Sequence, residues 1–424
     1  MTSVYFITEG CSVNQSDTEI MEGLLKEAQF GIVDSLEDAD IVIFNTCTVK
    51  NPSESAFFHE LEKIKIESPY KTIIIAGCIA QSDPTHPILK NYCLIGTRQI
   101  HKIVEVVEEA LNDNIIRMLE KGEMPPLNLH RVRKNPVVGI IQLNLGCLGS
   151  CTFCKTKSAR FYLKSYPIDD ILKEAKQALS EGVKEIWLTS QDAFCYGFDV
   201  DADVADLLNA LVKLPGDFKI RVGIGNADHM PRIKDKLIQA YKHPKIFKLL
   251  YLPLQSGNNK ILEDMKRKHT VEEFDQIIAD FKKEIPDINI MTDIIVGYPT
   301  ETEDQYFDTL NAVRRHSFDS ANISRFWPRP GTPAAKLDLL SDDVVNHRSK
   351  VLTDIFHNIS KLQNEKWRGW EGEIIINEKK GDEGWIGHNY AYKSVLIKGN
   401  HNLGDKLNVK IMKTLIFELI GEVV

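Results

Sequence analysis

Three cysteines stand close together in the stretch LNLGCLGSCTFCKTK, at Cys147, Cys151 and Cys154. They follow a short apolar run, which places them in the loop after a buried strand. Three thiolates on one loop can hold a cubic [4Fe–4S] cluster and leave its fourth iron without a protein ligand. That open iron can chelate S-adenosylmethionine and pass an electron to its sulfonium, which yields a 5′-deoxyadenosyl radical. The triplet therefore predicts radical chemistry.

The alternative for these cysteines is a structural zinc site. Structural zinc takes four ligands, usually as two CxxC or CxxH pairs. No second pair follows the triplet, so the spacing favours an iron–sulfur cluster.

A second set of cysteines lies in the first hundred residues. Cys11, Cys47 and Cys78 each follow an apolar run that reads as a strand. Taken singly, each would more often be a small buried hydrophobe. The carboxyl ends of parallel strands share one edge of a sheet, so three thiols can converge there. We expect them to hold a second [4Fe–4S] cluster, and we predict no ligand role for Cys93 or Cys195.

The periodicity divides the chain into four segments. Residues 1–111 alternate apolar strands with amphipathic helices, which predicts a doubly wound α/β domain. Residues 112–136 are proline-rich and basic and read as a linker. Residues 137–364 contain six strand candidates separated by helices, which predicts a partial (β/α)6, TIM-like barrel with functional groups in the loops after its strands. Residues 365–424 read as a small antiparallel β-barrel of OB-like type.

The six strand candidates of the middle segment are VVGIIQLN, VKEIWLTS, FKIRVGIG, IFKLLYLPL, INIMTDIIVG and SANISRF.

Composition limits the class of protein. With 43% hydrophobic and 26% charged residues, the chain is typical of a folded soluble protein. We find no secretory signal and no apolar run of the roughly 18 residues that a membrane helix needs. A cytoplasmic location without membrane partners is expected, where cysteines stay reduced. The net charge of −8 argues against a protein that coats nucleic acid non-specifically, but it permits a local basic surface.

Together these motifs resemble the methylthiotransferase family of radical S-adenosylmethionine (radical SAM) enzymes. The superfamily is defined by CxxxCxxC after the first strand of a partial barrel. The family adds cysteines in GCxxN, NTC and GC contexts, which match Cys11, Cys47 and Cys78 here. It ends in a small β-barrel called TRAM that grips tRNA, so the resemblance covers essentially the whole chain.

The CKTK sequence of Cys154–Lys157 resembles the archaeal and eukaryotic branch that acts on N6-threonylcarbamoyladenosine in tRNA. That branch usually continues ARG, whereas here Phe161 follows Arg160, and GNADHM stands where a GMTNP-like stretch is expected. Three alternatives stay open. Two of them are other substrates for the same chemistry, an isopentenylated adenosine in tRNA or an aspartate of a ribosomal protein. The third is that the chain is a non-catalytic iron–sulfur or zinc RNA-binding protein.

The resemblance implies a reaction with two [4Fe–4S] clusters. A methyl group from one S-adenosylmethionine goes to sulfur on the N-terminal cluster. A second molecule is cleaved at the barrel cluster, and its radical takes hydrogen from C2 of the adenine, to which the sulfur then bonds. The implied partners are the anticodon stem-loop of tRNA, a sulfur donor, and an electron donor such as a flavodoxin or ferredoxin. Anticodon bases are single-stranded, so one can enter a pocket without opening a duplex.

The resemblance also suggests cofactor contacts in the barrel loops. The loop TSQDAFCYG would contact the amino group of the cofactor; the alternative interpretation of Ser190 or Asp192 is an ordinary helix cap. The candidate contacts are Gln191, Asp192, Gln255, Ser256, Asp293 and Arg325.

The C-terminal segment offers side chains that suit RNA. Aromatic rings stack on bases and lysines reach phosphates. These candidates are Trp367, Trp370, Trp385, Tyr390, Tyr392, Lys393, Lys398, Lys406 and Lys410. The more conservative interpretation places half of the aromatics in the core of the small barrel.

Overall fold

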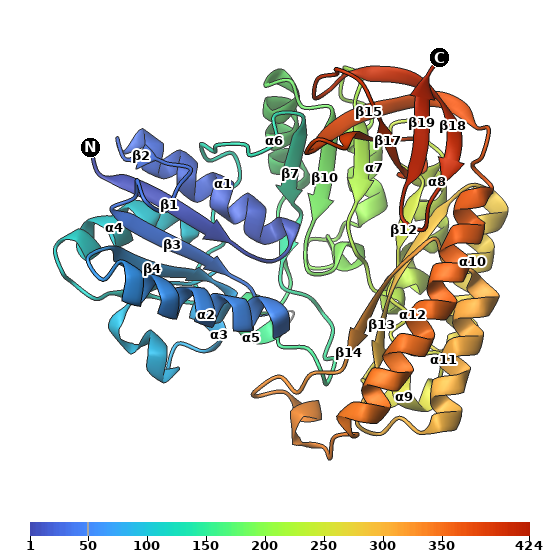
Figure 1. Cartoon of the computed structure of the whole chain (residues 1–424), viewed down its shortest axis with the longest axis horizontal. Helices are drawn as coiled ribbons and strands as arrows, with labels where there is room; N and C mark the ends of the chain where they lie inside the picture. The colour runs from blue at the N-terminus through green and yellow to red at the C-terminus, as the bar shows by residue number, and fades with distance from the viewer. Residues whose placement is uncertain (49–50) are drawn as a thin grey trace.

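The computed structural model describes residues 1–48 and 51–424, except for the side chains of residues 51–53. Figure 1 shows three parts: an N-terminal α/β domain, a central set of parallel strands covered by helices, and a small β-barrel at the C-terminus. In the described residues, we find no helix long and apolar enough to span a bilayer.

The N-terminal domain is a parallel sheet with helices on both faces. Its strand order is β2-β1-β3-β4-β5-β6. The strands are β1 (Ser3–Thr8), β2 (Gly31–Ile32), β3 (Ile41–Thr46), β4 (Thr72–Gly77), β5 (Cys93–Ile95) and β6 (Arg117–Met118). The helices are α1 (Ser12–Glu27), α2 (Asn51–Glu67), α3 (Cys78–Ser82) and α4 (Ile103–Leu111).

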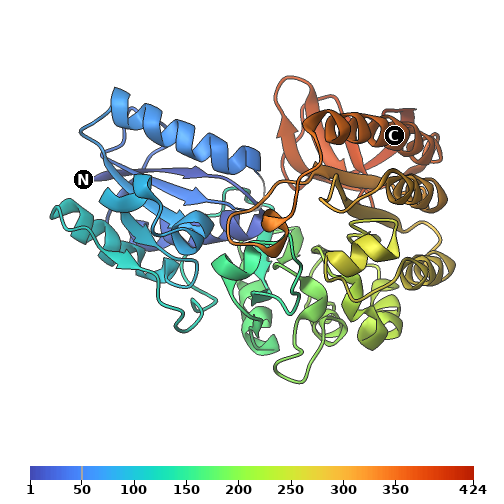
Figure 2. The same ribbon diagram turned by 90° about the horizontal axis from the view of Figure 1, so that it is seen from below.

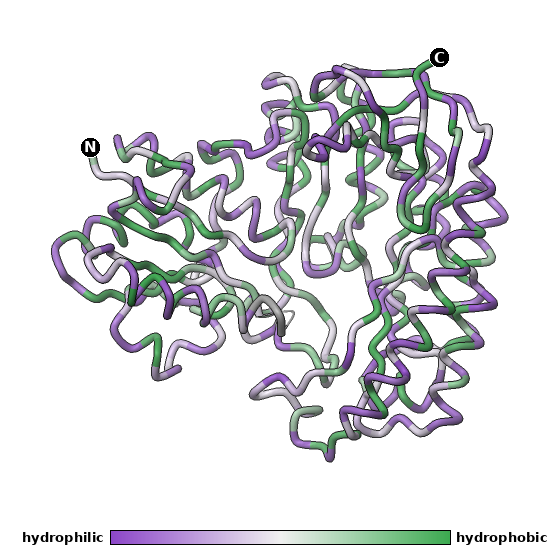
Figure 3. Tube along the Cα trace, viewed as in Figure 1, coloured by the Kyte–Doolittle hydropathy of each residue, from purple (hydrophilic) through white to green (hydrophobic). Residues whose placement is uncertain are grey.

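Alternation along β3 explains the two covered faces. Ile41 and Ile43 pack in one apolar core with α1 and α4, whereas Val42 and Phe44 pack in another core with α2. Figure 3 shows the apolar strands running through the interior of this domain. The predicted doubly wound domain is confirmed, and the segment predicted as a linker contributes the edge strand β6.

The central part contains six parallel strands in two groups of three. One group has the order β11-β10-β7 and the other β12-β13-β14, and a parallel bridge between Ile220 and Ile246 joins the groups. The strands are β7 (Val138–Gln142), β10 (Glu185–Thr189), β11 (Lys219–Val222), β12 (Leu249–Tyr251), β13 (Asn289–Val296) and β14 (Ser320–Arg325). Each lies within one of the six predicted runs, which confirms the partial barrel.

Helices surround these strands, and a short hairpin carries the CxxxCxxC loop. The helices are α5 (Thr156–Arg160), α6 (Ile168–Ser180), α7 (Val204–Leu211), α8 (Met230–Tyr241), α9 (Asn259–Asp264), α10 (Val271–Glu284), α11 (Glu303–His316) and α12 (Asp342–Glu365). The hairpin strands are β8 (Asn144–Leu145) and β9 (Lys164–Ser165). The local sequence determines where several of these helices begin. Helix α10, for example, begins with a reciprocal capping box between Thr270 and Glu273.

The C-terminal part is a closed barrel in the order β15-β16-β17-β19-β18. Its strands are β15 (Glu371–Lys380), β16 (Gly384–His388), β17 (Ser394–Ile397), β18 (Lys406–Thr414) and β19 (Leu419–Val423). The small barrel is confirmed, with one difference from the antiparallel prediction, because β17 and β19 pair in parallel.

The small barrel packs against the amino ends of the central strands. The Lys248 amide, just before β12, donates to the Tyr390 carbonyl at 2.8 Å. The side-chain Nδ2 of Asn289, at the start of β13, donates to the Ala391 carbonyl at 3.1 Å. The cysteine loops lie at the opposite, carboxyl ends of the strands, beside the N-terminal domain (Figure 1). The fold thus separates the small barrel from the cysteines.

Candidate active site

The first cysteine triplet lies on the loop between β8 and α5. All three thiols are partly buried, and Gly146 begins the loop with φ +75°. A Cβ at Gly146 would collide with the backbone of Tyr162, so only glycine fits this turn. The amide of Gly146 donates to Oε1 of Gln191 at 2.7 Å. Gln191, a predicted cofactor contact, thus holds the cysteine loop in place.

The thiols of this triplet influence one another. Burial, with the neighbouring Cys154 as the next cause, raises the pKa of the Cys147 thiol to about 12. Close thiolates without a cation would repel one another, whereas bound iron removes their protons and compensates their charge. The donor set of three thiols on one loop therefore fits a [4Fe–4S] cluster with one open iron.

A guanidinium lies beside this triplet. Nη1 of Arg267 is 3.7 Å from Sγ of Cys151, and Nη2 donates to Asn226. Asp228 accepts from the ring of His269 at 2.7 Å and completes this group. Sequence reasoning missed Arg267; the basic run KRKH after the PLQSG segment was the available signal.

The second triplet converges at the carboxyl edge of the N-terminal sheet. Cys11 precedes α1, Cys47 follows β3, and Cys78 begins α3 after β4. A Cβ on Gly10 would lie 2.6 Å from Cβ and 2.9 Å from Sγ of Cys47. Burial is the main cause that raises the pKa of the Cys78 thiol, and Cys11 lies close enough to add to this effect. Three loops far apart in sequence thus bring their thiols together.

Asparagines fix these three loops. Nδ2 of Asn14 donates to the Thr46 carbonyl at 2.7 Å, and Nδ2 of Asn45 donates to the Asn14 carbonyl at 2.8 Å. The Thr46 hydroxyl donates to the Ala76 carbonyl at 2.6 Å. The polar residues of the GCxxN and NTC contexts therefore form the buried frame of the second triplet.

Arg160, at the end of α5, reaches into the second triplet from the loop of the first. It donates to Asp17 at 2.8 Å and to Asn14 at 3.2 Å, and it lies against the Cys78 thiol. Its side chain is 2% exposed, and Nη1 has no hydrogen-bond partner among the described residues. A buried cation with an unused donor beside three thiols fits an anionic iron–sulfur cluster.

The two triplets face each other across the boundary between the domains. Arg329, on the loop after β14, pairs with Glu54 at 3.2 Å and lies close enough to both Cys47 and Cys154 to interact with their charges. Figure 2 shows this loop reaching toward the N-terminal domain. A cavity of about 360 Å³ lies there, lined by Cys154, Asp83 and the loop from Pro330. One cavity therefore adjoins the first triplet and the domain that carries the second.

The two acidic residues among the predicted cofactor contacts have protein partners. Asp192 accepts from the amide of Asn226 at 2.9 Å and from the ring of His229 at 3.0 Å. Asp293 accepts from the Tyr251 hydroxyl at 2.7 Å. Asp192 follows the carboxyl end of β10 and interacts electrostatically with Cys147, whereas Asp293 lies in the middle of β13.

Gln255 and Ser256 lie on the segment that follows β12, a few residues beyond the end of the strand. Gln255 has φ +68°, and its buried Oε1 has no hydrogen-bond partner among the described residues. Ser256 is fully buried beside Thr309. Arg325, by contrast, is exposed and donates to Asn346. The structure thus leaves a free acceptor at Gln255 and engages Arg325 at the surface.

Neither remaining cysteine stands free. Cys195 is buried and donates to the Asp192 carbonyl at 3.2 Å. Its thiol, Asp192 and His229 have ligand atoms within 4.8 Å of one another, but Asp192 and His229 already bond each other. Cys93 lies in the core of the N-terminal domain and donates to the Asn114 carbonyl.

Several C-terminal side chains expected to meet RNA are engaged within the protein. Lys393 is buried and pairs with Asp319 at 2.8 Å. Lys410 pairs with Glu371 at 2.6 Å, and Lys406 pairs with acidic residues on two segments. The Tyr392 ring stacks on His388 with centroids 4.0 Å apart. The expectation of an RNA contact is wrong for Lys393, because its side chain is buried and its charge is paired with Asp319. Tyr392 is half-buried, so its RNA contact stays a prediction.

Two known families match separate stretches of this chain. Residues 141–313 match the radical SAM superfamily, and residues 3–95 match the uncharacterized protein family UPF0004. A threonylcarbamoyladenosine tRNA methylthiotransferase of Drosophila melanogaster is 38% identical over 435 residues, which span 99% of this chain and 77% of that protein. The human protein of that name is 38% identical over 94% of this chain and 69% of its own length.

An archaeal relative and a solved structure extend the comparison. A protein of Pyrococcus horikoshii, named a probable threonylcarbamoyladenosine tRNA methylthiotransferase, is 36% identical over the full length of both chains. A radical S-adenosylmethionine methyltransferase of Kitasatospora setae superposes with a TM-score of 0.56 at 12% identity, over 79% of this chain and 75% of that chain. The second likeness shows the fold alone.

Proposed function

Because the chain belongs to the threonylcarbamoyladenosine tRNA methylthiotransferase family and is a radical SAM transferase, we propose that it converts N6-threonylcarbamoyladenosine beside the tRNA anticodon to its 2-methylthio derivative. The observation that carries the proposal is the pair of cysteine triplets on facing sides of one domain boundary, with Arg329 near both. A cytoplasmic location stays a prediction.

The proposal includes two [4Fe–4S] clusters. Cys147, Cys151 and Cys154 would hold the first, and Cys11, Cys47 and Cys78 the second. When bound, the clusters and S-adenosylmethionine supply hydrogen abstraction from C2 of the adenine and the methylated sulfur that replaces this hydrogen. Electrons and sulfur must come from donors outside the chain, of the flavodoxin or ferredoxin class and of the persulfide or sulfide class.

The protein's own side chains would position and insulate these groups. Gln191 and Gly146 fix the first cysteine loop, and Arg267 places positive charge at Cys151. Arg160 places positive charge at Cys78, and its side chain and that of its partner Asp17 are both buried. Positive charge beside a sulfur ligand favours the thiolate and the more negative state of a cluster.

The free acceptor at Gln255 suits the ammonium or an adenine amino group of S-adenosylmethionine. Because a buried acceptor without a donor is costly, a bound ligand that donates there would remove that cost. Asp192 and Asp293 already accept hydrogen bonds from protein groups, so we assign them a positioning role within the central barrel.

The test is reconstitution under anaerobic conditions, followed by assay with tRNA. We expect roughly eight irons per chain for two [4Fe–4S] clusters. After reaction with S-adenosylmethionine and a reductant, mass spectrometry of digested tRNA should show 2-methylthio-N6-threonylcarbamoyladenosine. Product from isopentenyladenosine tRNA alone would overturn the substrate assignment, and roughly four irons per chain would overturn the second cluster.

A further inference from the structure

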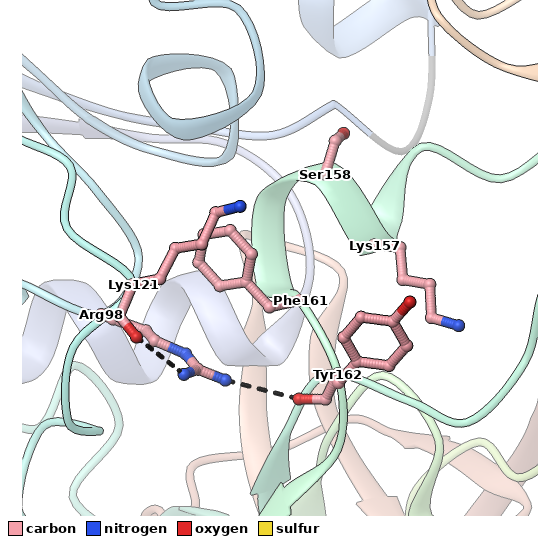
Figure 4. Close-up of a pocket in the computed structure, with 6 residues that line it drawn as sticks. All are labelled: Arg98, Lys121, Lys157, Ser158, Phe161 and Tyr162. Atoms are coloured by element: carbon pink, nitrogen blue, oxygen red, sulfur yellow. Dashed lines mark hydrogen bonds between the residues drawn. The ribbon is translucent and has the colours of Figure 1, made fainter.

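A basic pocket lies where the N-terminal domain meets α5 and the turn that follows it (Figure 4). Its volume is about 500 Å³. The residues that line it are Arg98, Lys121, Lys157, Ser158, Phe161 and Tyr162. Three of these are cations, and the lining in the described part of the chain includes no carboxylate, although the whole chain carries a net charge of −8.

Phe161 occupies this pocket at a conformational cost. Its backbone has φ +65° and ψ −152°, a region that is essentially restricted to glycine. Glycine at this position would make the same turn without strain. Phe161 therefore carries a strain that glycine would avoid, and its ring is the feature that glycine lacks.

Cations hold the Phe161 ring. The guanidinium of Arg98 lies 5.1 Å from the ring centroid and Nζ of Lys121 lies 5.3 Å from it. Arg98 also donates to the Lys121 carbonyl at 3.3 Å and to the Tyr162 carbonyl at 3.4 Å, as Figure 4 shows. Arg98 thus fixes the two walls of the pocket.

The opposite side of the pocket is open to a ligand. Tyr162 is 72% exposed, and Nζ of Lys157 lies 4.5 Å from its ring centroid. An exposed ring beside an ammonium can stack a base and bind an anion attached to it. Lys157 and Ser158 also line the cavity that contains Cys154, so the pocket adjoins the first cysteine triplet.

We propose that this pocket binds an anionic group of the substrate's anticodon loop, with a base of that loop against Tyr162 or Phe161. Two sources share this chemistry: the carboxylate of the threonylcarbamoyl group and a backbone phosphate. The proposal rests on the proposed function, because it assigns an RNA contact next to the reacting site, in addition to any contact that the C-terminal barrel makes. The ammonium groups of Lys121 and Lys157 would pair with the anion.

The experiment measures binding of an anticodon stem-loop RNA, with and without the threonylcarbamoyl group, to the reconstituted full-length protein. Lys121→Gln and Lys157→Gln should each weaken binding of the modified RNA by about tenfold, the loss expected for one charge-assisted hydrogen bond. Lys173→Gln, on the exposed face of α6, is the matched control and should bind as the wild type does.

The two RNAs identify the source of the anion. Loss confined to the modified RNA assigns the carboxylate, whereas equal loss with both RNAs and a shallower salt dependence assigns a phosphate. Unchanged affinity of both variants for both RNAs overturns the pocket. Failure of the wild-type protein to methylthiolate the modified tRNA is a separate outcome, which overturns the proposed function.

Phe161→Gly provides an independent variant. It removes the ring and relieves the backbone, so the protein should fold and retain its iron. We expect RNA affinity to fall as for the lysine variants. Wild-type affinity in Phe161→Gly would show that the ring takes no part in binding.

Discussion

The two cysteine triplets are built in different ways. Cys147, Cys151 and Cys154 share one loop, so eight consecutive residues carry the whole site. Cys11, Cys47 and Cys78 come from three loops that meet only because their strands are parallel and adjacent in one sheet. The first site therefore depends on local backbone geometry, and the second depends on the fold of the entire N-terminal domain.

Replacement of single cysteines should show the largest difference between the two triplets. Cys147→Ala should abolish reductive cleavage of S-adenosylmethionine, because the remaining two thiols cannot fix the open iron in place. Cys47→Ala should retain measurable cleavage and lose methylthiolation. The assay quantifies 5′-deoxyadenosine and the methylthio product in parallel; cleavage that persists in Cys147→Ala would contradict the assignment of the first triplet.

Arg160 connects the two sites, and its loss should have the next largest effect. Arg160→Gln leaves Asp17 buried without its cation, which costs about 3–5 kcal/mol in the free energy of unfolding. It also removes positive charge from Cys78, so the reduction potential of the second cluster should become more negative. Redox titration followed by electron paramagnetic resonance measures this shift, and chemical denaturation measures the stability.

Two conservative variants make this prediction specific. Arg160→Lys keeps the positive charge, so the reduction potential of its second cluster should stay close to that of the wild type. Arg267→Lys alters the donor beside Cys151 and should shift the potential of the first cluster instead. Equal potentials in the wild type and Arg160→Gln would show that Arg160 serves only to join the domains.

The local triplet and the barrel strands could be predicted from sequence, because each depends on residues close together in the chain. The second triplet could be predicted only through the geometry of parallel sheets. Contacts between distant segments could not: nothing in the sequence indicates that Arg160 meets Asp17 or that Arg329 meets Glu54.

The C-terminal lysines illustrate the same limit. Sequence shows that Lys393 is charged, but not that Asp319 of the central barrel neutralises it. Surface charge can be read from composition only when the partners are nearby in sequence. The RNA contact predicted for this lysine failed for that reason.

Replacement of a glycine beside each triplet should have a smaller effect and tests how much each triplet depends on the surrounding backbone. Gly10 has φ +114°, and a Cβ there would lie 2.6 Å from Cβ of Cys47. Gly10→Ala should cost at least about 1–2 kcal/mol from the backbone alone and reduce the iron of the second cluster. Gly149→Ala is the control in the first triplet, because its Cβ would stay 3.6 Å from the nearest thiol. If iron analysis found the same loss of iron in both variants, the two triplets would not differ in their dependence on the surrounding backbone.

The smallest expected effect concerns pH and the metal-free protein. Burial, and then Cys154, raises the pKa of the Cys147 thiol from 9.0 to about 12. Between these values the folded chain binds more protons than the unfolded chain, so the contribution of Cys147 to stability falls as pH rises. Metal-free wild type should therefore lose more stability than metal-free Cys147→Ser between pH 9 and pH 11, as measured by denaturant midpoints. Iron uptake, which needs thiolates, should accelerate over the same range.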